Sequence, residues 1–331
     1  MLKVAVIGVG SMGRNHVRVY SEMPGVELVG VADANPAAAE AIGAKYGVPA
    51  FADYNDLLAK AQPDAVTIAV PTALHEEVAG AALEAGAHVL VEKPIAATLE
   101  QGRRLIALAE QHNRKLMVGH IVRFNPALQM LKQKLNDGEL GRTFQIVCRR
   151  AGPFPARIRD VGVVVDLAPH DLDVMRFLTD SEPVRIFAEV ERRVHTEHED
   201  LMLGLVRFAN GVIGHLEINW LTPTKMREVL VLGERGMFRV DDLTQDLYFF
   251  ENAETEGDLW GALQAIKGVS EGRMVRFAVP RQEPLKLELQ AFVDAVASDR
   301  PVPVGGVDGL QALKLALMLV ESGRKNQAQV V

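Results

Sequence analysis

Two polar residues of one predicted helix have types and spacing that suit proton transfer. Asp166 and His170 are four positions apart in "VVVDLAPHDLDVMRFL", residues 163–178, and would share one face of a helix. An imidazole, with a pKa near ~6.5, can accept a proton that a neighbouring carboxylate helps to orient. Pro169 requires this helix to start close to Asp166. Taken singly, Asp166 also suits a helix cap and His170 a structural histidine.

A lysine follows directly after a predicted buried strand. In "VLVEKPIA", residues 89–96, an apolar run ends in Glu92 and Lys93, and Pro94 follows at once. Burying charge beside an apolar run costs several kcal/mol unless a partner or a ligand offsets it. Lys93 therefore either reaches out into water, as many lysines do, or belongs to a site that uses its charge.

Three glycines near the start have the spacing of a dinucleotide-binding turn. Gly8, Gly10 and Gly13 form G-x-G-x-x-G between a predicted strand and a predicted helix, where they allow a tight turn and close approach of a pyrophosphate. Asp33 ends the next strand and can accept hydrogen bonds from a ribose diol, which favours NAD over NADP. One alternative is that the glycines serve only in packing. Another is that Asp33 only caps the helix that starts at Asn35.

The elements around these residues alternate between strand and helix. Continuous apolar runs predict buried strands, and glycine, proline and capping residues mark the helices between them. The predicted strands cover residues 3–9, 26–33, 65–70, 88–92 and 115–120. This order predicts an α/β domain over residues 1–120 with a doubly wound parallel sheet of the Rossmann type.

The second half of the chain has a different pattern. After a helix from Asn125 to about Asn136, strand-like runs follow one another, and the Asn-Gly pair at 210–211 predicts a hairpin. Residues 121–331 are therefore expected to form an α+β domain with an open, mostly antiparallel sheet. One face of that sheet must meet solvent, substrate or a second subunit.

Composition excludes several classes of protein. The 331 residues are 48% hydrophobic, carry a net charge of -7 and have a pI near 5.8, which makes nucleic acid an unlikely partner. Cys148 is the single cysteine, so an intrachain disulfide is impossible and a reducing compartment is expected. The start lacks the pattern of a signal peptide and no apolar run reaches the ~20 residues of a membrane span. We expect a soluble cytoplasmic protein.

The combined motifs resemble those of the Gfo/Idh/MocA oxidoreductases. The matching stretches are GVGSMG at 8–13, AVPTALH at 69–75, EKP at 92–94, GHIVRFNP at 119–126 and DLAPH at 166–170. The resemblance covers nearly the whole chain. It implies an NAD-dependent dehydrogenase in which Lys93, Asp166 and His170 are catalytic and the Lys93–Pro94 bond is cis.

The resemblance also implies contacts for the cofactor and for assembly. The residues that it assigns to NAD are Gly8, Gly10, Ser11, Met12, Gly13, Asp33, Pro71, Thr72, His75, Glu92, Lys93 and His120. Core or loop positions remain almost equally good interpretations of His75 and His120. The family uses its open sheet for homodimer or homotetramer contacts, and a helix over about 306–323 packs back on its first domain.

Oxidation of an alcohol requires a base, a hydride acceptor and positive charge near the developing alkoxide. His170 suits the base, and Asp166 would orient it or hold a substrate hydroxyl. Lys93 suits stabilisation of the alkoxide, or would itself be the base if burial lowered its pKa. The hydride acceptor is the nicotinamide of NAD.

The substrate is indicated by residues 149–178, which are most similar to the subgroup that oxidises the 3-hydroxyl of UDP-N-acetylglucosamine. Arginine suits diphosphate recognition. The residues assigned to substrate are Arg123, Asn125, Arg149, Arg157 and Arg159, with Arg150 as a further candidate for the diphosphate. The alternatives are a basic solvated face, a free polyol or sugar such as inositol as substrate, and a non-catalytic NAD-binding regulator.

Two other stretches contain residue types that occur in functional sites. His195, Glu197, His198, Glu199 and Asp200 match no zinc spacing, so we expect no metal and a solvated loop there. Residues 251–276, rich in glycine and charge, are expected to form a flexible excursion that closes over the substrate.

Overall fold

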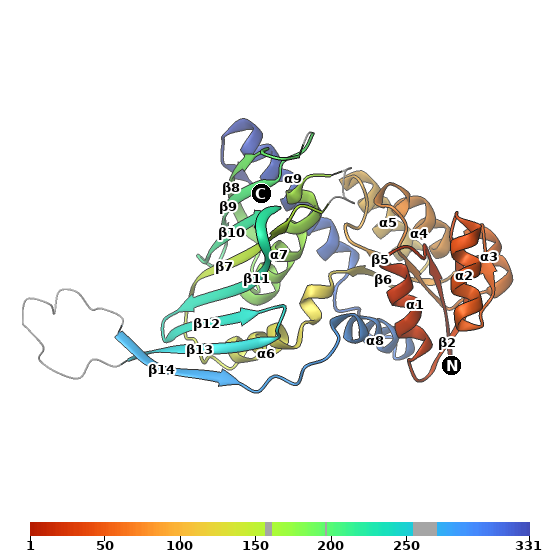
Figure 1. Ribbon diagram of the computed structural model, residues 1–331, viewed down its shortest axis with the longest axis horizontal. Coiled ribbons are helices and arrows are strands. Elements are labelled where there is room, and N and C mark those ends of the chain that lie inside the picture. The colour runs from red at the N-terminus through yellow and green to blue at the C-terminus, as the bar shows by residue number, and fades with distance from the viewer. Residues whose placement is uncertain (156–160, 196, 254–269) are drawn as a thin grey trace, which may run out of the picture. The chain divides into compact units, whose positions relative to one another are not determined.

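The computed structural model describes residues 1–155, 161–195, 197–253 and 270–331. The described chain forms two compact units, whose elements are labelled in Figure 1. The first unit contains Met1–Phe124 and Gln282–Leu315, and the second contains Asn125–Arg281 and Ala316–Val331. Of the helices in the described ranges, none is long and apolar enough to cross a membrane.

The first unit is a parallel sheet with helices between its strands. Its elements are β1 (Leu2–Ile7), α1 (Gly13–Ser21), β2 (Val26–Ala32), α2 (Pro36–Tyr46), β3 (Ala50–Phe51), α3 (Tyr54–Ala61), β4 (Ala65–Ile68), η1 (Thr72–Leu74), α4 (His75–Glu84), β5 (His88–Glu92), α5 (Leu99–Gln111), β6 (Leu116–Gly119), η2 (Ile121–Phe124) and α8 (Pro284–Ala297). The strand order is β3-β2-β1-β4-β5-β6. All five pairings are parallel, which confirms the predicted Rossmann topology.

Local sequence explains where these elements begin. Asn35 and Thr98 accept hydrogen bonds from main-chain N–H groups of α2 and α5, and Thr98 forms a capping box with Gln101, as the sequence predicts. Val4, Ala5 and Val6 are completely buried in β1, because helices cover both faces of the sheet.

A late segment of the chain belongs to the first unit. The sequence places the domain boundary at residue 120. In the structure, however, α8 packs against α1 and η2 and so belongs to the first unit. Helix α9 (Gly306–Lys325) contributes its first half to this unit and its second half to the other. Near its start, a Cβ on Gly309 would lie 2.6 Å from the Val118 side chain, so glycine permits this close packing.

The second unit is a mixed sheet with helices on one face. Its further elements are α6 (Pro126–Asn136), β7 (Thr143–Pro153), α7 (Val163–Thr179), β8 (Pro183–Glu191), β9 (Leu201–Phe208), β10 (Ile213–Asn219), β11 (Leu221–Gly233), β12 (Gly236–Asp241), β13 (Asp246–Ala253), β14 (Ser270–Phe277) and β15 (Gln329–Val330). Among the described residues the order is β14-β13-β12-β11-β7-β10-β9-β8-β15. Only the β7–β10 pair of this described sheet is parallel. The predicted mostly antiparallel sheet is confirmed.

The alternation of side chains sets the two faces of this sheet. β9 and β10 pair antiparallel around residues 209–212, as the Asn-Gly pair predicts. Leu216 and Ile218 are fully buried, while His215 and Glu217 between them are partly exposed. Helix α7 packs against β7, β9 and β10 on the buried face, which leaves the other face open within this unit.

Candidate active site

The glycine turn leaves room where a pyrophosphate would approach. Gly8 has a φ of +88°, and a Cβ there would lie 2.6 Å from the Ala69 carbonyl group. A Cβ on Gly13 would overlap the carbonyl oxygen of Gly8, whereas one on Gly10 would meet no atom within 4 Å. Helix α1 begins at Gly13 without a side-chain cap. The open space and the uncapped helix start fit an anionic group.

A cavity of about 360 Å³ lies beside this turn, at the carboxyl ends of the strands. Gly8, Gly10, Asp33 and Pro71 are among the residues that line it. Asp33 Oδ2 accepts a hydrogen bond from the Val9 N–H at 2.8 Å, and Oδ1 accepts one from the Asn35 N–H at 2.9 Å. Asp33 therefore supports the cap residue Asn35, whose own side chain caps α2. Each carboxylate oxygen keeps a lone pair, so the residues also fit a ribose in the cavity.

The end of β5 is held by hydrogen bonds from another helix. The Lys93–Pro94 peptide bond is cis, as the resemblance implies. Glu92 Oε1 lies 2.8 Å from Nε2 of His16, which is fully buried in α1. Burial raises the pKa of Glu92, but the hydrogen bond and charge of His16 together with the charge and main-chain N–H of Lys93 outweigh it, so that the pKa falls below its ordinary value. Sequence reasoning missed His16, because 76 residues separate it from Glu92.

His75 is a core histidine that joins two main-chain segments. Its Nδ1 lies 2.8 Å from the Pro94 carbonyl oxygen and its Nε2 lies 3.0 Å from that of Val70. The side chain is only 1% exposed, and burial lowers its pKa. Both ring nitrogens thus face main-chain carbonyl oxygens near Lys93, and a neutral imidazole donates to one of them. Contact of His75 with NAD stays a prediction.

The remaining residues predicted to bind cofactor are placed as follows. Ser11 and Met12 lie in the turn before α1, and the Ser11 carbonyl accepts a hydrogen bond from the Asn15 side chain at 3.0 Å. Thr72 begins η1 directly after Pro71. His120 follows β6 and is 1% exposed. Contact of these residues with NAD stays a prediction.

Helix α7 carries both predicted proton-transfer residues. Asp166 and His170 are partly exposed on it. The helix begins at Val163, earlier than Asp166, so Pro169 lies in its second turn. Glu199 fixes this start, since its carbonyl accepts from the Val163 N–H at 2.9 Å and its Oε1 accepts from the Val164 N–H at 3.2 Å.

The loop that supplies Glu199 is not the solvated loop that the sequence predicts. His195 and Asp200 are buried. Asp200 accepts hydrogen bonds from the main-chain N–H groups of Arg193, Val194 and His195. Burial raises the pKa of Asp200, but these hydrogen bonds outweigh it and lower the pKa overall. Glu199 and Asp200 thus accept hydrogen bonds from main-chain N–H groups.

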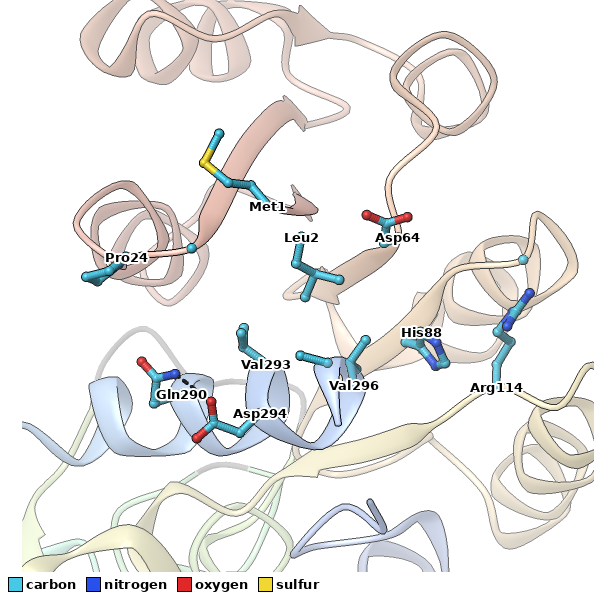
Figure 2. Close-up of a pocket in the computed structure, with 13 residues that line it drawn as sticks. Met1, Leu2, Pro24, Asp64, His88, Arg114, Gln290, Val293, Asp294 and Val296 are labelled. Atoms are coloured by element: carbon cyan, nitrogen blue, oxygen red, sulfur yellow. Dashed lines mark hydrogen bonds between the residues drawn. The ribbon is translucent and has the colours of Figure 1, made fainter. Parts of the chain in front are cut away.

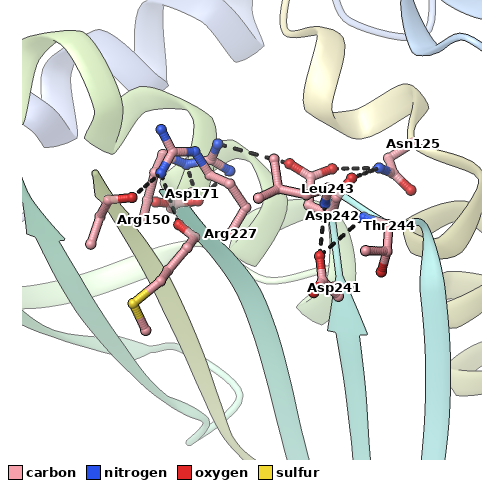
Figure 3. Close-up of polar contacts among 10 residues, drawn as sticks. Asn125, Arg150, Asp171, Arg227, Asp241, Asp242, Leu243 and Thr244 are labelled. Carbon is pink, nitrogen blue, oxygen red and sulfur yellow. Dashed lines mark hydrogen bonds and ion pairs between the residues drawn. The ribbon is translucent and has the colours of Figure 1, made fainter. Parts of the chain in front are cut away.

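A network of buried charges joins α7 to the sheet (Figure 3). Arg150 Nε and Nη2 each lie 2.8 Å from Asp171 Oδ1, and Arg150 Nη1 lies 3.9 Å from Asp242. The Arg150 and Asp171 side chains are 7% and 2% exposed. Asn125 Nδ2 donates to the Asp242 carbonyl at 2.9 Å. The network ties α7 to strand β7 through the Arg150–Asp171 pair.

The residues predicted to bind substrate do not share one place. Arg149 lies on the open face, 2.8 Å from Glu217 and 3.4 Å from Glu228, because neighbouring residues of a strand point to opposite faces. This placement directs Arg149 away from α7 and argues against its predicted contact with substrate there. Arg157 and Arg159 lie outside the described residues, as does most of the 251–276 segment.

Arg123 and Asn125 are engaged within their own units. Arg123 Nη1 donates to the Pro303 carbonyl at 3.1 Å, and Arg123 Nη2 lies 3.7 Å from Asp308. Asn125 is 1% exposed and caps α6 through a 2.9 Å bond from the Ala127 N–H. The cap at Asn125 agrees with the helix start that the sequence predicts there, and the contact of either residue with substrate stays a prediction.

The catalytic candidates come from different units. Lys93 belongs to the first unit, and Asp166 and His170 belong to the second. Their meeting around one substrate remains a prediction. In the described part of the chain, no group of three or more His, Cys, Asp or Glu side chains is arranged to hold a metal ion.

A larger cavity of the first unit lies at the amino ends of its strands, opposite the glycine turn (Figure 2). It measures about 780 Å³, and Leu2, Asp64, His88 and Arg114 line it together with residues of α8. Leu2 and His88 begin β1 and β5. Cofactors bind at the carboxyl ends of such strands, so this cavity lies away from the predicted chemistry.

Comparison with known proteins identifies both halves of the chain. Residues 2–120 match the NAD-binding Rossmann fold of the GFO_IDH_MocA oxidoreductase family, and residues 128–239 match the GFO/IDH/MocA C-terminal domain. The first unit is therefore an NAD-binding domain, in agreement with the glycine turn and its adjacent cavity.

Full-length relatives extend the match. UDP-N-acetylglucosamine 3-dehydrogenase of Acidithiobacillus ferrooxidans is 31% identical over 318 residues, 96% of each chain. Its solved structure, named GnnA, superposes with a TM-score of 0.85 at 30% identity over 97% of each chain. Inositol 2-dehydrogenase of Rhizobium meliloti is 32% identical over 329 residues, 97% of this chain and 96% of the relative. This protein belongs to the Gfo/Idh/MocA family of NAD-dependent oxidoreductases.

Proposed function

We propose that this protein oxidises a sugar hydroxyl with NAD, and that its substrate is a UDP-N-acetylhexosamine oxidised at the 3-hydroxyl. The observation that carries this proposal is the end-to-end similarity to a UDP-N-acetylglucosamine 3-dehydrogenase in sequence and in structure. A relative named for inositol is equally similar in sequence, so a free polyol is the second candidate substrate.

The chain's own residues divide the chemistry among them. The glycine turn and Asp33 hold NAD, which supplies the acceptor for the hydride that leaves the substrate carbon. His170 takes the proton of the substrate hydroxyl, and Asp166 orients its imidazole or holds a second hydroxyl. Lys93 places positive charge beside the oxygen as that proton leaves. The carbon loses its hydride and the oxygen its proton, which leaves a ketone.

The surroundings of Lys93 support its assignment. Glu92, directly before it, contacts His16, and Pro94, directly after it, contacts His75. The residues on either side of Lys93 are thus each held by a buried histidine. A catalytic charge works best where the fold has already positioned it.

Substitution of Lys93 tests the catalytic assignment. We expect Lys93→Met to lower kcat by about a hundredfold to ten-thousandfold and to leave the Kd for NAD nearly unchanged. Lys60→Met is the matched control, since Lys60 is exposed and pairs only with Asp56 on its own helix. NADH formation and calorimetric NAD titration give the two readouts. Near-normal turnover by Lys93→Met would refute the assignment.

A panel of substrates tests the proposed reaction. Wild-type protein with NAD is offered UDP-N-acetylglucosamine, UDP-glucose and myo-inositol, and NADH formation is followed. We expect the highest kcat/KM with the N-acetylated nucleotide sugar. Turnover of inositol alone would establish the second candidate, and no turnover of any alcohol would indicate a non-catalytic NAD-binding regulator.

The open face of the second unit supports a homo-oligomer. Leu203 and Leu205 on β9 are 47% and 50% exposed, and Ile213 on β10 is 38% exposed. Apolar side chains gathered on one sheet face commonly mark a protein interface. We propose a homodimer or homotetramer through this face, and light scattering of the purified protein measures which one forms.

A further inference from the structure

Arg227 is a half-buried arginine that sequence reasoning did not consider. It lies on β11 directly opposite Arg150 of β7. Paired residues of neighbouring strands share a face, so Arg227 projects to the face that α7 covers. Figure 3 shows it beside Arg150 and Asp171. Its neighbour Glu228 points to the open face, where it pairs with Arg149 and Arg239.

The contacts of Arg227 leave its charge without a direct ion pair. Arg227 Nη1 donates to the carbonyl oxygens of Ala151 and Met226, at 2.6 Å and 2.8 Å. Among the described residues, no carboxylate lies within 4 Å of the Arg227 guanidinium, whereas Arg150 holds Asp171 at 2.8 Å. Within the described part of the chain, this half-buried cation has no carboxylate partner of the kind that normally offsets desolvation.

The electrostatic surroundings point the same way. Burial lowers the pKa of Arg227, and the positive charge of Arg150 lowers it further, while Asp171, Asp242 and Asp166 raise it by less. An additional anion would therefore stabilise the charged guanidinium. The influence of Asp166 also shows that Arg227 lies within electrostatic reach of the residue predicted to act beside His170.

A second cation lies beside Arg227. A Cβ built on Gly152 would make ordinary van der Waals contacts, at 3.5 Å with the Lys225 side chain and at 4.0 Å with Arg227 Nη1. Lys225 and Arg227 therefore flank the same glycine of β7. A diphosphate carries more than one negative charge, and an arginine fork beside a lysine suits it.

We propose that Arg227, assisted by Lys225, binds the diphosphate of the substrate on the α7 face of the second unit. This inference rests on the proposed oxidation of a nucleotide sugar and names the residue that distinguishes such a substrate from a neutral polyol. It replaces Arg149, which faces the other way, as the phosphate-binding arginine.

The test compares binding of UDP by protein saturated with NAD. Isothermal titration is carried out on wild type, Arg227→Gln, Arg227→Lys and Arg239→Gln. The control removes one arginine from the neighbouring strand β12, where Arg239 pairs with Glu228 on the open face. We expect Arg227→Gln to weaken UDP binding about tenfold to a hundredfold, as for loss of a charge-assisted contact. Arg239→Gln should bind UDP as wild type does.

Two further measurements keep the outcome decisive. If Arg227→Gln fails to fold, Arg227→Lys serves instead, because it keeps the charge and loses the planar fork. Weaker UDP binding by Arg227→Lys supports the inference, and wild-type affinity of this variant overturns it. D-glucuronate, titrated in parallel, tests a carboxylate as the anion. Binding of glucuronate in place of UDP would overturn the diphosphate assignment.

Failure of this inference and failure of the proposed function give different results. Unchanged UDP affinity in Arg227→Gln, with wild-type turnover of UDP-N-acetylglucosamine intact, overturns the role of Arg227 and leaves the function standing. UDP binding that depends on Arg227, with no turnover of any nucleotide sugar by the wild type, supports the anion site and refutes the function. Absence of UDP binding by the wild type overturns the inference.

Discussion

Removing the charge of Asp171 tests whether the buried ion pair holds α7 in place. Asp171→Asn keeps the shape of the side chain and leaves Arg150 buried, with Asp242 at 3.9 Å as its remaining acidic neighbour. In the described part of the chain, Asp171 Oδ2 has no hydrogen-bond partner, so the new amide group would add a buried donor without an acceptor there.

The expected cost follows from the burial of the pair. Arg150 and Asp171 side chains are 7% and 2% exposed, and removing one partner of such a pair typically costs about 3–5 kcal/mol. Replacing both, as in Arg150→Met with Asp171→Leu, removes both charges and should recover a large part of that loss. The order of stability is therefore wild type, double variant, then Asp171→Asn.

Tryptophan fluorescence provides an assay for this unit alone. Trp220 is buried in the second unit, and Trp260, the other tryptophan of the chain, lies outside the described residues. Urea titration followed by fluorescence therefore reports unfolding of the unit that contains the pair, and linear extrapolation gives the free energy.

A surface pair supplies the control. Glu234→Gln breaks the Arg142–Glu234 pair, in which Arg142 is 78% exposed and Glu234 is 48% exposed. This substitution should change the free energy of unfolding little. A loss for Asp171→Asn below about 1 kcal/mol, or one equal to that of Glu234→Gln, would refute the reasoning that this network fixes α7.

Two other predictions concern the first unit. Gly10→Ala should fold as the wild type does, because its Cβ meets no atom within 4 Å. It should nevertheless bind NAD about tenfold to a hundredfold more weakly. Gly13→Ala should be less stable than the wild type even without NAD, because its Cβ overlaps the Gly8 carbonyl. Equal effects of the two substitutions in thermal unfolding and NAD titration would contradict the geometry. For His75, burial lowers the folded pKa, so the unfolded chain binds the proton first. Its contribution to stability is complete above about pH 6.5 and is lost as the pH falls toward the folded pKa. Thermal unfolding of His75→Gln should accordingly depend less on pH in this window than that of the wild type, and parallel profiles would exclude the role of His75.

Local patterns in the sequence were sufficient for the order and type of most elements. The caps at Asn35 and Thr98, the glycine turn at 8–13 and the Asn-Gly hairpin at 210–211 depend on hydrogen bonds and backbone conformations within a few residues. Such signals are readable without tertiary structure. The assignment of NAD followed from the glycines and Asp33 for the same reason.

Misplaced site residues share a different cause. Arg149 and Arg150 are adjacent in sequence, yet one pairs with Glu217 on the open face and the other with Asp171 under α7. Asn125, which the sequence assigns to substrate, also caps α6 and donates a hydrogen bond to the Asp242 carbonyl. In each case the direction of the side chain depends on a partner far away in sequence.

The sequence by itself determined a parallel dinucleotide-binding domain, a following, mostly antiparallel sheet and the chemical types of the catalytic candidates, because periodicity, caps and turns act over short distances. Only the tertiary structure decided which arginine is neutralised and which is not. That decision depends on the pairing of β7 with β11 and on the packing of α7. These contacts join residues 77 positions apart, such as Arg150 and Arg227, and so leave no pattern in any short stretch of the chain.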